Sequence, residues 1–257
     1  MISENRLRVL ARNKEAGVGL MEKDYVNSWI LYALFQSSLA DKLLFKGGTA
    51  LSKLYFPQRW RFSEDLDFTV ISNIENLIPN LKRSLSDTGD LSGIGFRIRD
   101  THKNPDYAQV KIQYDAVLAQ KNTTKLDLFW DEFVHFSSVE STHTFEDVPE
   151  FDIRHYSLEE IFAEKLRSLF QRARARDYFD LYWLIKLKDF DCKRTKEALE
   201  EKASFKRLEI TRSEFQNKKE IEEVRNYWDR ALDRLTSSKP DFDKVVKTIK
   251  AYMDELW

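Results

Sequence analysis

Residues 61–68 read RFSEDLDF, and this stretch decides the fold. From Asp65 onward, the apolar residues Leu66, Phe68 and Val70 alternate with other residues. A period of two predicts a β-strand with one buried face, so the two aspartates of the stretch project from the opposite face. Two ionised carboxylates placed so close repel each other. A bridging divalent cation such as Mg²⁺ removes that penalty, because it prefers hard oxygen ligands.

A glycine pair lies upstream of this strand. Gly47 and Gly48 stand between an apolar run at 43–45 and a helix-like run at 50–55. Glycines at a strand-to-helix turn let backbone N–H groups approach a phosphate closely. Thr49, which follows the pair, is a candidate for phosphate binding or for capping the helix. A phosphate cradle followed by a carboxylate pair indicates nucleotide chemistry.

Composition limits the classes of partner. The 257 residues carry a formal net charge of −1, so any nucleic-acid contact must come from a local basic patch. Cys192 is the only cysteine, which excludes an intrachain disulfide. The first residues show no signal-peptide pattern, and no apolar run approaches membrane-spanning length. We therefore expect a cytoplasmic protein that does not contact a membrane.

Helices and strands mix in the first part of the chain. Residues 22–39 have helical spacing with Asp24 as the expected N-cap. The other expected elements are a strand at 43–46, a helix at 74–85, loops at 88–93, and strands at 96–99, 110–114 and 126–129. This mixture predicts an α+β sheet domain over residues 1–152.

The composition changes after Pro149. Most segments from Ser157 onward have helical periodicity, and Ser157 with Glu160 predicts a capping box. We expect a helical bundle over residues 153–257, in which the charge-rich stretch 202–225 is a solvated helix face.

These motifs together resemble the AbiEii/AbiGii family of nucleotidyltransferase toxins, which includes the MenT-like toxins of type IV toxin–antitoxin systems. The resemblance rests on Gly-Gly-Thr at 47–49 and on Arg-x-Ser-x-Asp-x-Asp at 61–67, and it covers roughly residues 23–187. The spacer of sixteen residues between Gly48 and Asp65 favours this branch. The resemblance implies a polymerase-β-like mixed-sheet domain and a helical domain that completes the active site.

A third carboxylate follows in Lys125-Leu126-Asp127, which matches the Lys-x-Asp motif of the family. On a strand, Asp127 would face the same way as Asp65 and Asp67. By resemblance, these three aspartates hold Mg²⁺ or Mn²⁺. The alternative is that Asp127 is an exposed side chain on an edge strand.

Two motifs fall in the helical half. Lys165 matches a family lysine suited to the distal phosphates, although on an ordinary surface helix it would pair with a neighbouring glutamate. Asp177 matches the functional carboxylate of an Arg-x-Arg-Asp-x-x-Asp motif, whereas Asp180 fits a structural role as well. The resemblance also predicts a helix break near residues 171–175.

Basic residues next to these motifs are candidates for binding phosphates. Arg172, Arg174 and Arg176 form the densest basic cluster, which suits an RNA end or a solvated helix face. Arg61 is placed to reach the triphosphate or to pair with Asp65. Ser63 is placed to bind a phosphate or to cap the loop.

The resemblance implies a complete reaction. A nucleoside triphosphate binds over Gly47–Thr49 and Lys165, an acceptor hydroxyl attacks the α-phosphate, and pyrophosphate leaves. The 3′ end of tRNA is the expected acceptor, and an antitoxin protein is the expected partner. The alternatives are transfer to a protein or a small molecule, and a non-catalytic nucleotide-binding or partner-binding module.

Overall fold

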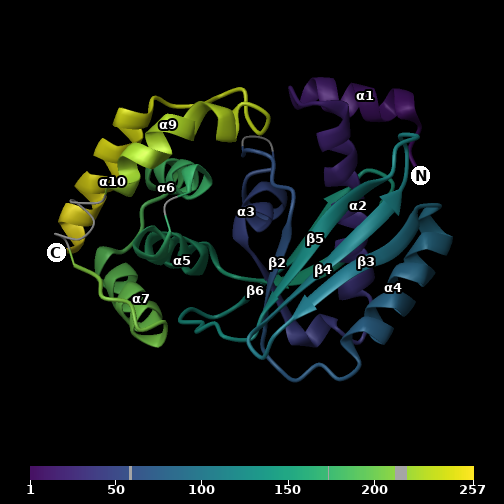
Figure 1. The fold of residues 1–257 in the computed structure, drawn as a ribbon, viewed down its shortest axis with the longest axis horizontal. Helices are drawn as coiled ribbons and strands as arrows, with labels where there is room; N and C mark the ends of the chain where they lie inside the picture. The colour runs from purple at the N-terminus through teal and green to yellow at the C-terminus, as the bar shows by residue number, and fades with distance from the viewer. Residues whose placement is uncertain (58–59, 173, 212–218) are drawn as a thin grey trace. The chain divides into compact units, whose positions relative to one another are not determined.

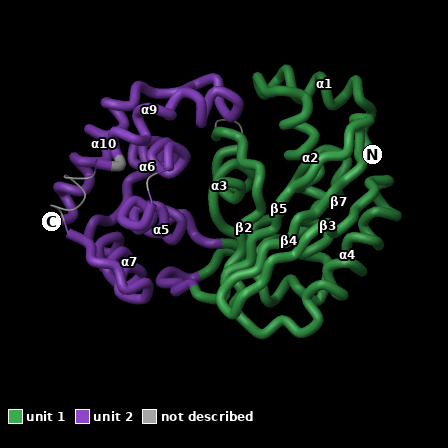
Figure 2. The backbone as a smooth tube through the Cα atoms, in the orientation of Figure 1, with its two compact units in different colours: residues 1–131, 138–155 green, residues 132–137, 156–257 purple. Residues whose placement is uncertain are grey.

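The fold is given by a computed structural model, which describes residues 1–57, 60–172, 174–211 and 219–257. These residues form two compact units (Figure 2). The first unit comprises residues 1–131 and 138–155, and the second comprises residues 132–137 and 156–257. A mixed sheet belongs to the first unit and helices make up most of the second, which confirms the predicted α+β class.

One mixed sheet organises the first unit (Figure 1). Among the described residues, its order is β3-β4-β5-β2-β1-β7-β6. The strands are β1 Leu43–Lys46, β2 Leu66–Val70, β3 Gly95–Lys103, β4 Tyr107–Asp115, β5 Asn122–Phe129, β6 Val139–Phe145 and β7 Val148–His155. The pairs β2–β5 and β1–β7 are parallel, and the other neighbouring pairs are antiparallel.

Two long helices pack on the apolar side of this sheet. Helix α2 Val18–Phe35 contacts β5 and β7, and helix α4 Leu77–Ser92 contacts β3 and α2. Thr124 on β5 donates to Asn27 of α2, so Leu126 and Leu128, which share the face of Thr124, also point to the helical side. The side chain of Asp127 therefore projects from the other face. The remaining helical segments of this unit are α1 Glu4–Asn13, η1 Ala40–Lys42, α3 Gly47–Ala50 and η2 Leu51–Tyr55.

Both long helices differ from the sequence prediction at their ends. Helix α2 begins at Val18 after an N-cap at Gly17, so Asp24 lies within the helix and binds Lys53 instead of capping. Helix α4 continues through the predicted loop to Ser92 and ends at Gly93, which has a φ of +76°. Glycine suits position 89 within this helix, because the chain after the helix passes so close that an added Cβ would lie 3.0 Å from the carbonyl oxygen of Ile94.

The second unit is helical in its described residues. Its helices are α5 Leu158–Gln171, α6 Ala175–Leu187, α7 Cys192–Phe205, α9 Glu220–Leu232 and α10 Phe242–Leu256. Helix α5 packs against α6 and α7, and α10 packs against α6 and α7. The rings of Phe162 and Phe190 stack with centroids 4.0 Å apart, and Tyr252 meets Phe162 edge-on. The break between α5 and α6 confirms the predicted interruption near residues 171–175.

The start of α5 confirms half of the predicted capping box. The Ser157 hydroxyl accepts from the backbone N–H of Glu160 at 3.1 Å. The Glu160 carboxylate, however, binds the backbone N–H of Phe136 and forms a 2.5 Å ion pair with Lys202. Both charged side chains are almost fully buried, so Lys202 does not belong to a solvated face as predicted. Among the described residues, no helix is long and apolar enough to span a membrane.

Candidate active site

Four polar side chains form one row across the centre of the sheet in the first unit. Strand register places Lys46 of β1 opposite Asp67 of β2, and Asp67 opposite Asp127 of the parallel strand β5. Asp127 in turn lies opposite Gln109 of β4. Residues opposite each other on neighbouring strands project from the same face. The row therefore lies on the face away from α2.

Hydrogen bonds fix the carboxylate of Asp127. Its Oδ1 accepts from the Tyr107 hydroxyl at 2.5 Å and from the Gln109 amide at 2.9 Å. Burial and the bond to Asp127 raise the pKa of the Tyr107 hydroxyl above its usual value, which keeps it protonated as a donor. Asp127 is only 9% exposed and lies on a central strand, so the alternative of an exposed edge-strand aspartate is wrong.

The sequence analysis missed Tyr107 and Gln109. Both side chains project from the face of β4 that carries the odd-numbered residues. The alternation of these two polar residues with the apolar Ala108 and Val110 is the sequence pattern from which they could have been predicted. Lys46 was missed as well, because it ends an apolar run. It is 3% exposed, and its Nζ lies 4.6 Å from the centroid of the Phe129 ring.

The glycine turn lies directly against the predicted site residues. Gly47 has a φ of +78°, and an added Cβ would lie 2.5 Å from Oδ2 of Asp67. At Gly48, a Cβ would lie 2.7 Å from Nη2 of Arg61 and 3.1 Å from Oγ of Ser63. Both glycines are therefore required for the close approach of the protein's own polar side chains. Arg61 and Ser63 are buried, and Arg61 also donates to the Phe62 carbonyl.

The loop before β2 is held from several sides. The Thr49 hydroxyl donates to the Asp65 carbonyl at 2.5 Å, and the Glu64 carbonyl accepts from Asn27 and Thr124. Asp65 lies just before β2 and not within it. The N-cap of α3 is Lys46, so Thr49 positions the loop that carries Asp65 instead of capping the helix.

The carboxylates of the row fit a nucleotide-bound cation. Among the residues that the structure describes, no three histidine, cysteine, aspartate or glutamate side chains form a preassembled metal cage. A magnesium site in nucleotide enzymes uses one or two carboxylates, with the phosphates and water supplying the other ligands. Asp67 and Asp127 lie opposite each other on β2 and β5, which is the spacing that such a carboxylate pair needs. The assignment of Asp65, Asp67 and Asp127 as metal ligands stays a prediction.

A second polar cluster lies within the helical unit. The Lys165 ammonium on α5 is 2.6 Å from Oδ1 of Asp177 and 3.0 Å from Oδ2 of Asp180, both on α6. Arg172 approaches the other oxygen of Asp177 at 3.3 Å. Both aspartates are buried. The structure thus brings Lys165, Asp177 and Asp180 together, which replaces the alternative of a surface lysine paired with a glutamate of its own helix.

The predicted RNA-binding arginines surround the start of α6. Arg172 and Arg174 are exposed, and Arg176 is partly buried. Arg172 and Arg174 flank residue 173, which lies outside the described residues. Their role in RNA binding, and the completion of the active site by the helical unit, stay predictions.

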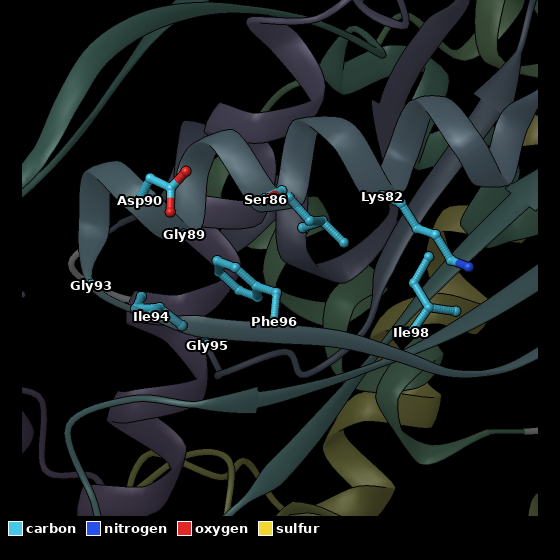
Figure 3. A pocket seen from close by; sticks show the side chains of 10 residues that line it. Lys82, Ser86, Gly89, Asp90, Gly93, Ile94, Gly95, Phe96 and Ile98 are labelled. Carbon is cyan, nitrogen blue, oxygen red and sulfur yellow. The ribbon is translucent and has the colours of Figure 1, made fainter.

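A cavity of about 390 Å³ lies elsewhere in the first unit. It is lined by residues of α4 and β3, including Ser86, Asp90 and Phe96 (Figure 3). None of the predicted site residues lines it.

Comparison with known proteins decides the family. Residues 29–248 match the model of a family described as nucleotidyl transferase AbiEii toxin, type IV TA system. The chain belongs to this family. The AbiEii family is one of nucleotidyltransferase toxins, which confirms the predicted enzyme class and the predicted toxin–antitoxin context.

A solved structure supports the fold of this AbiEii protein. The nucleotidyltransferase toxin MenT4 of Mycobacterium tuberculosis is similar, with a TM-score of 0.67 and 17% sequence identity. The match covers 100% of this chain and 91% of that one. At this identity the likeness shows a shared fold. No curated protein sequence matches the chain significantly.

Proposed function

We propose that this AbiEii enzyme transfers a nucleoside monophosphate from a nucleoside triphosphate to the 3′ end of tRNA in a reaction that requires Mg²⁺ or Mn²⁺. The observation that carries the proposal is the pairing of Asp67 with Asp127 beside the turn at Gly47 and Gly48. Carboxylates next to a glycine turn can hold the metal-bound triphosphate of a nucleotide. We place the reaction in the cytoplasm, where the triphosphate and tRNA occur.

In this mechanism Asp67 and Asp127 would hold the divalent cation. When bound, the cation neutralises the triphosphate and lowers the pKa of an attacking hydroxyl. The acceptor hydroxyl forms a bond to the α-phosphorus, the bond from that phosphorus to the bridging oxygen breaks, and pyrophosphate leaves. The hydroxyl proton passes to a carboxylate of the row. Tyr107 and Gln109 hold Asp127 in place throughout, and positioning supplies much of the rate.

The remaining predicted residues bind phosphates in this scheme. Arg61 and Ser63, buried against Gly48, stiffen the turn and offer donors to the triphosphate. Lys165, held between two aspartates, is a point charge suited to the β- or γ-phosphate. Asp177 holds Lys165 in that arrangement. A cognate antitoxin, which membership of the family implies, would limit the activity in the cell.

The experiment is an incubation of the purified protein with Mg²⁺, total bacterial tRNA and each α-labelled nucleoside triphosphate in turn. Asp67→Ala serves as the inactive control. Label in tRNA with the wild type alone supports the proposal and identifies the base. Label in protein or in a small molecule would keep the chemistry and change the acceptor. Nucleotide binding without transfer to any acceptor would favour a non-catalytic module and contradict the proposal.

A further inference from the structure

A second row of side chains crosses the same sheet face beside the carboxylate row. Lys125 precedes Asp127 by two residues on β5, and Lys111 follows Gln109 by two residues on β4. The register places these two lysines directly opposite each other. Because side chains two residues apart on a strand share a face, the lysines project from the face that carries Asp67 and Asp127.

The lysine pair does not stabilise the sheet. Like charges directly opposite each other on neighbouring strands repel. Both lysines are exposed, and neither forms an ion pair within the described part of the chain. Asp100 of β3 lies opposite Lys111 in the register, but its Oδ1 accepts from the backbone N–H of Thr101. An anion bound over the pair would remove the repulsion.

Arg97 lies beside this row on the same face, at the edge of the sheet. It is exposed on β3 opposite Gln113, the residue two positions after Lys111 on the same face of β4. Strands β5, β4 and β3 are consecutive neighbours (Figure 1). At a spacing of about 4.8 Å per strand, β3 lies roughly 14 Å from the strand that carries Asp67. A triphosphate seated at the glycine turn is too short to reach Arg97, whereas a polynucleotide strand spans that distance.

We propose that Lys125, Lys111 and Arg97 bind the sugar-phosphate backbone of the acceptor RNA and lead its terminal hydroxyl to the Asp67–Asp127 pair. This inference rests on the proposed function. Lysine and arginine contacts to phosphates fix the register of a nucleic acid without reading its sequence. The surface is distinct from the arginines at 172–176, which belong to the other unit. It gives the sheet itself a role in acceptor binding.

The test compares two double variants of the full chain that lose the same charge. Lys111→Gln with Arg97→Gln removes the two of the three proposed RNA-binding cations that lie farthest from the glycine turn. Lys82→Gln with Arg83→Gln removes two exposed cations from α4, on the helical side of the sheet, and is the control. Binding of fluorescent tRNA is measured without nucleotide over a range of salt concentrations. Binding of a nucleoside triphosphate with Mg²⁺ is measured without tRNA, and circular dichroism verifies folding.

The expected result is a loss of tRNA affinity of about tenfold or more for the Lys111 and Arg97 variant. The slope of log affinity against log salt should become shallower by about 1.4, because each lost phosphate contact contributes about 0.7 for a single strand. The control should keep its tRNA affinity and slope, and both variants should bind the triphosphate as the wild type does. Lys125→Gln, tested separately, should also weaken tRNA binding.

Three results would overturn the inference. The first is that the Lys111 and Arg97 variant keeps the tRNA affinity and the salt slope of the wild type. The second is that this variant loses triphosphate affinity by the same factor as tRNA affinity. The third is a wild-type protein that binds no tRNA while it labels another acceptor, which would leave the nucleotidyl transfer intact. If the wild type binds tRNA through this row but adds no nucleotide to it, the surface stands and the proposed acceptor fails.

Discussion

Asp67 and Asp127 lie directly opposite each other on the parallel strands β2 and β5. Neighbouring strands are about 4.8 Å apart, so one cation can bind both carboxylates. Because Asp127 is also fixed by two hydrogen bonds, the pair is held in position before any ligand binds. Preorganisation of this kind lowers the cost of assembling the transition state.

Removing one carboxylate should abolish transfer without unfolding the protein. We expect Asp127→Asn to lower kcat by at least about a hundredfold, since a catalytic metal supplies several kcal/mol of charge stabilisation. Asp152→Asn is the matched control, because Asp152 is also a strand aspartate with a hydroxyl partner, Thr142. Transfer rates with saturating Mg²⁺ and melting temperatures are the measurements. Equal loss of activity in the two variants would remove the special role of Asp127.

Adding one methyl group at the glycine turn should disturb the same site. In Gly47→Ala the Cβ collides with the Asp67 carboxylate, and the backbone keeps a positive φ of +78°. We expect a loss of unfolding free energy of about 1–3 kcal/mol and a loss of transfer activity. Urea denaturation measures the unfolding free energy, and the labelled-nucleotide assay measures the transfer activity.

Gly19→Ala is the control for this substitution. Gly19 lies in helix α2, and nothing lies within 4 Å of an added Cβ. Alanine there should raise the unfolding free energy by up to about 1 kcal/mol, because it restricts the unfolded chain and favours the helix. A Gly47→Ala variant as stable and as active as Gly19→Ala would show that the turn accepts a side chain.

Local patterns in the sequence were enough to predict the central strands and the direction of their polar side chains. The alternation around Leu66 and around Leu126 correctly placed Asp67 and Asp127 on the face opposite the apolar residues. The pairing of β2 with β5 could not be read in the same way. The register of two strands separated by more than fifty residues depends on long-range packing, which no local pattern records.

The polar contacts between distant segments were the least predictable. Glu160 was expected to return to the N-cap of its own helix, but its carboxylate binds Lys202 and the backbone of Phe136. A buried pair of this kind forms only when tertiary packing brings its members together. Tyr107 and Gln109 were missed for the same reason, since their importance comes from Asp127 on the neighbouring strand.

The hydrogen bond from Tyr107 should tune the affinity for the metal. Tyr107→Phe removes the hydroxyl that donates to Asp127 and keeps the ring beside Phe129. Loss of a hydrogen-bond partner of a metal ligand commonly costs about 10–100-fold in metal affinity or activity. We expect the Mg²⁺ concentration for half-maximal transfer to rise about tenfold. Tyr32→Phe is the control, because it removes the hydroxyl of another tyrosine of the first unit, whose ring contacts Phe151. An unchanged Mg²⁺ dependence in Tyr107→Phe would show that Gln109 alone holds the carboxylate.

Acid should destabilise the first unit through His143. Its imidazole is buried beside Ser28, and burial together with the nearby Lys53 ammonium lowers the pKa of His143 to about 3. Lys53 is itself paired with Asp24. The unfolded chain, with a histidine pKa of about 6.5, binds a proton that the folded chain excludes between pH 6.5 and 3. Stability is therefore greatest above pH 6.5 and falls as the pH decreases.

The contribution of His143 should amount to about 2 kcal/mol of unfolding free energy between pH 7 and pH 5. His143→Gln removes the titrating group and keeps a polar atom for Ser28. Urea denaturation of both proteins at pH 7, 6 and 5 gives the measurement. As the pH falls, the unfolding free energy of the wild type should decrease more than that of the variant. Parallel curves for the two proteins would mean that His143 is protonated as readily in the folded chain as in the unfolded one.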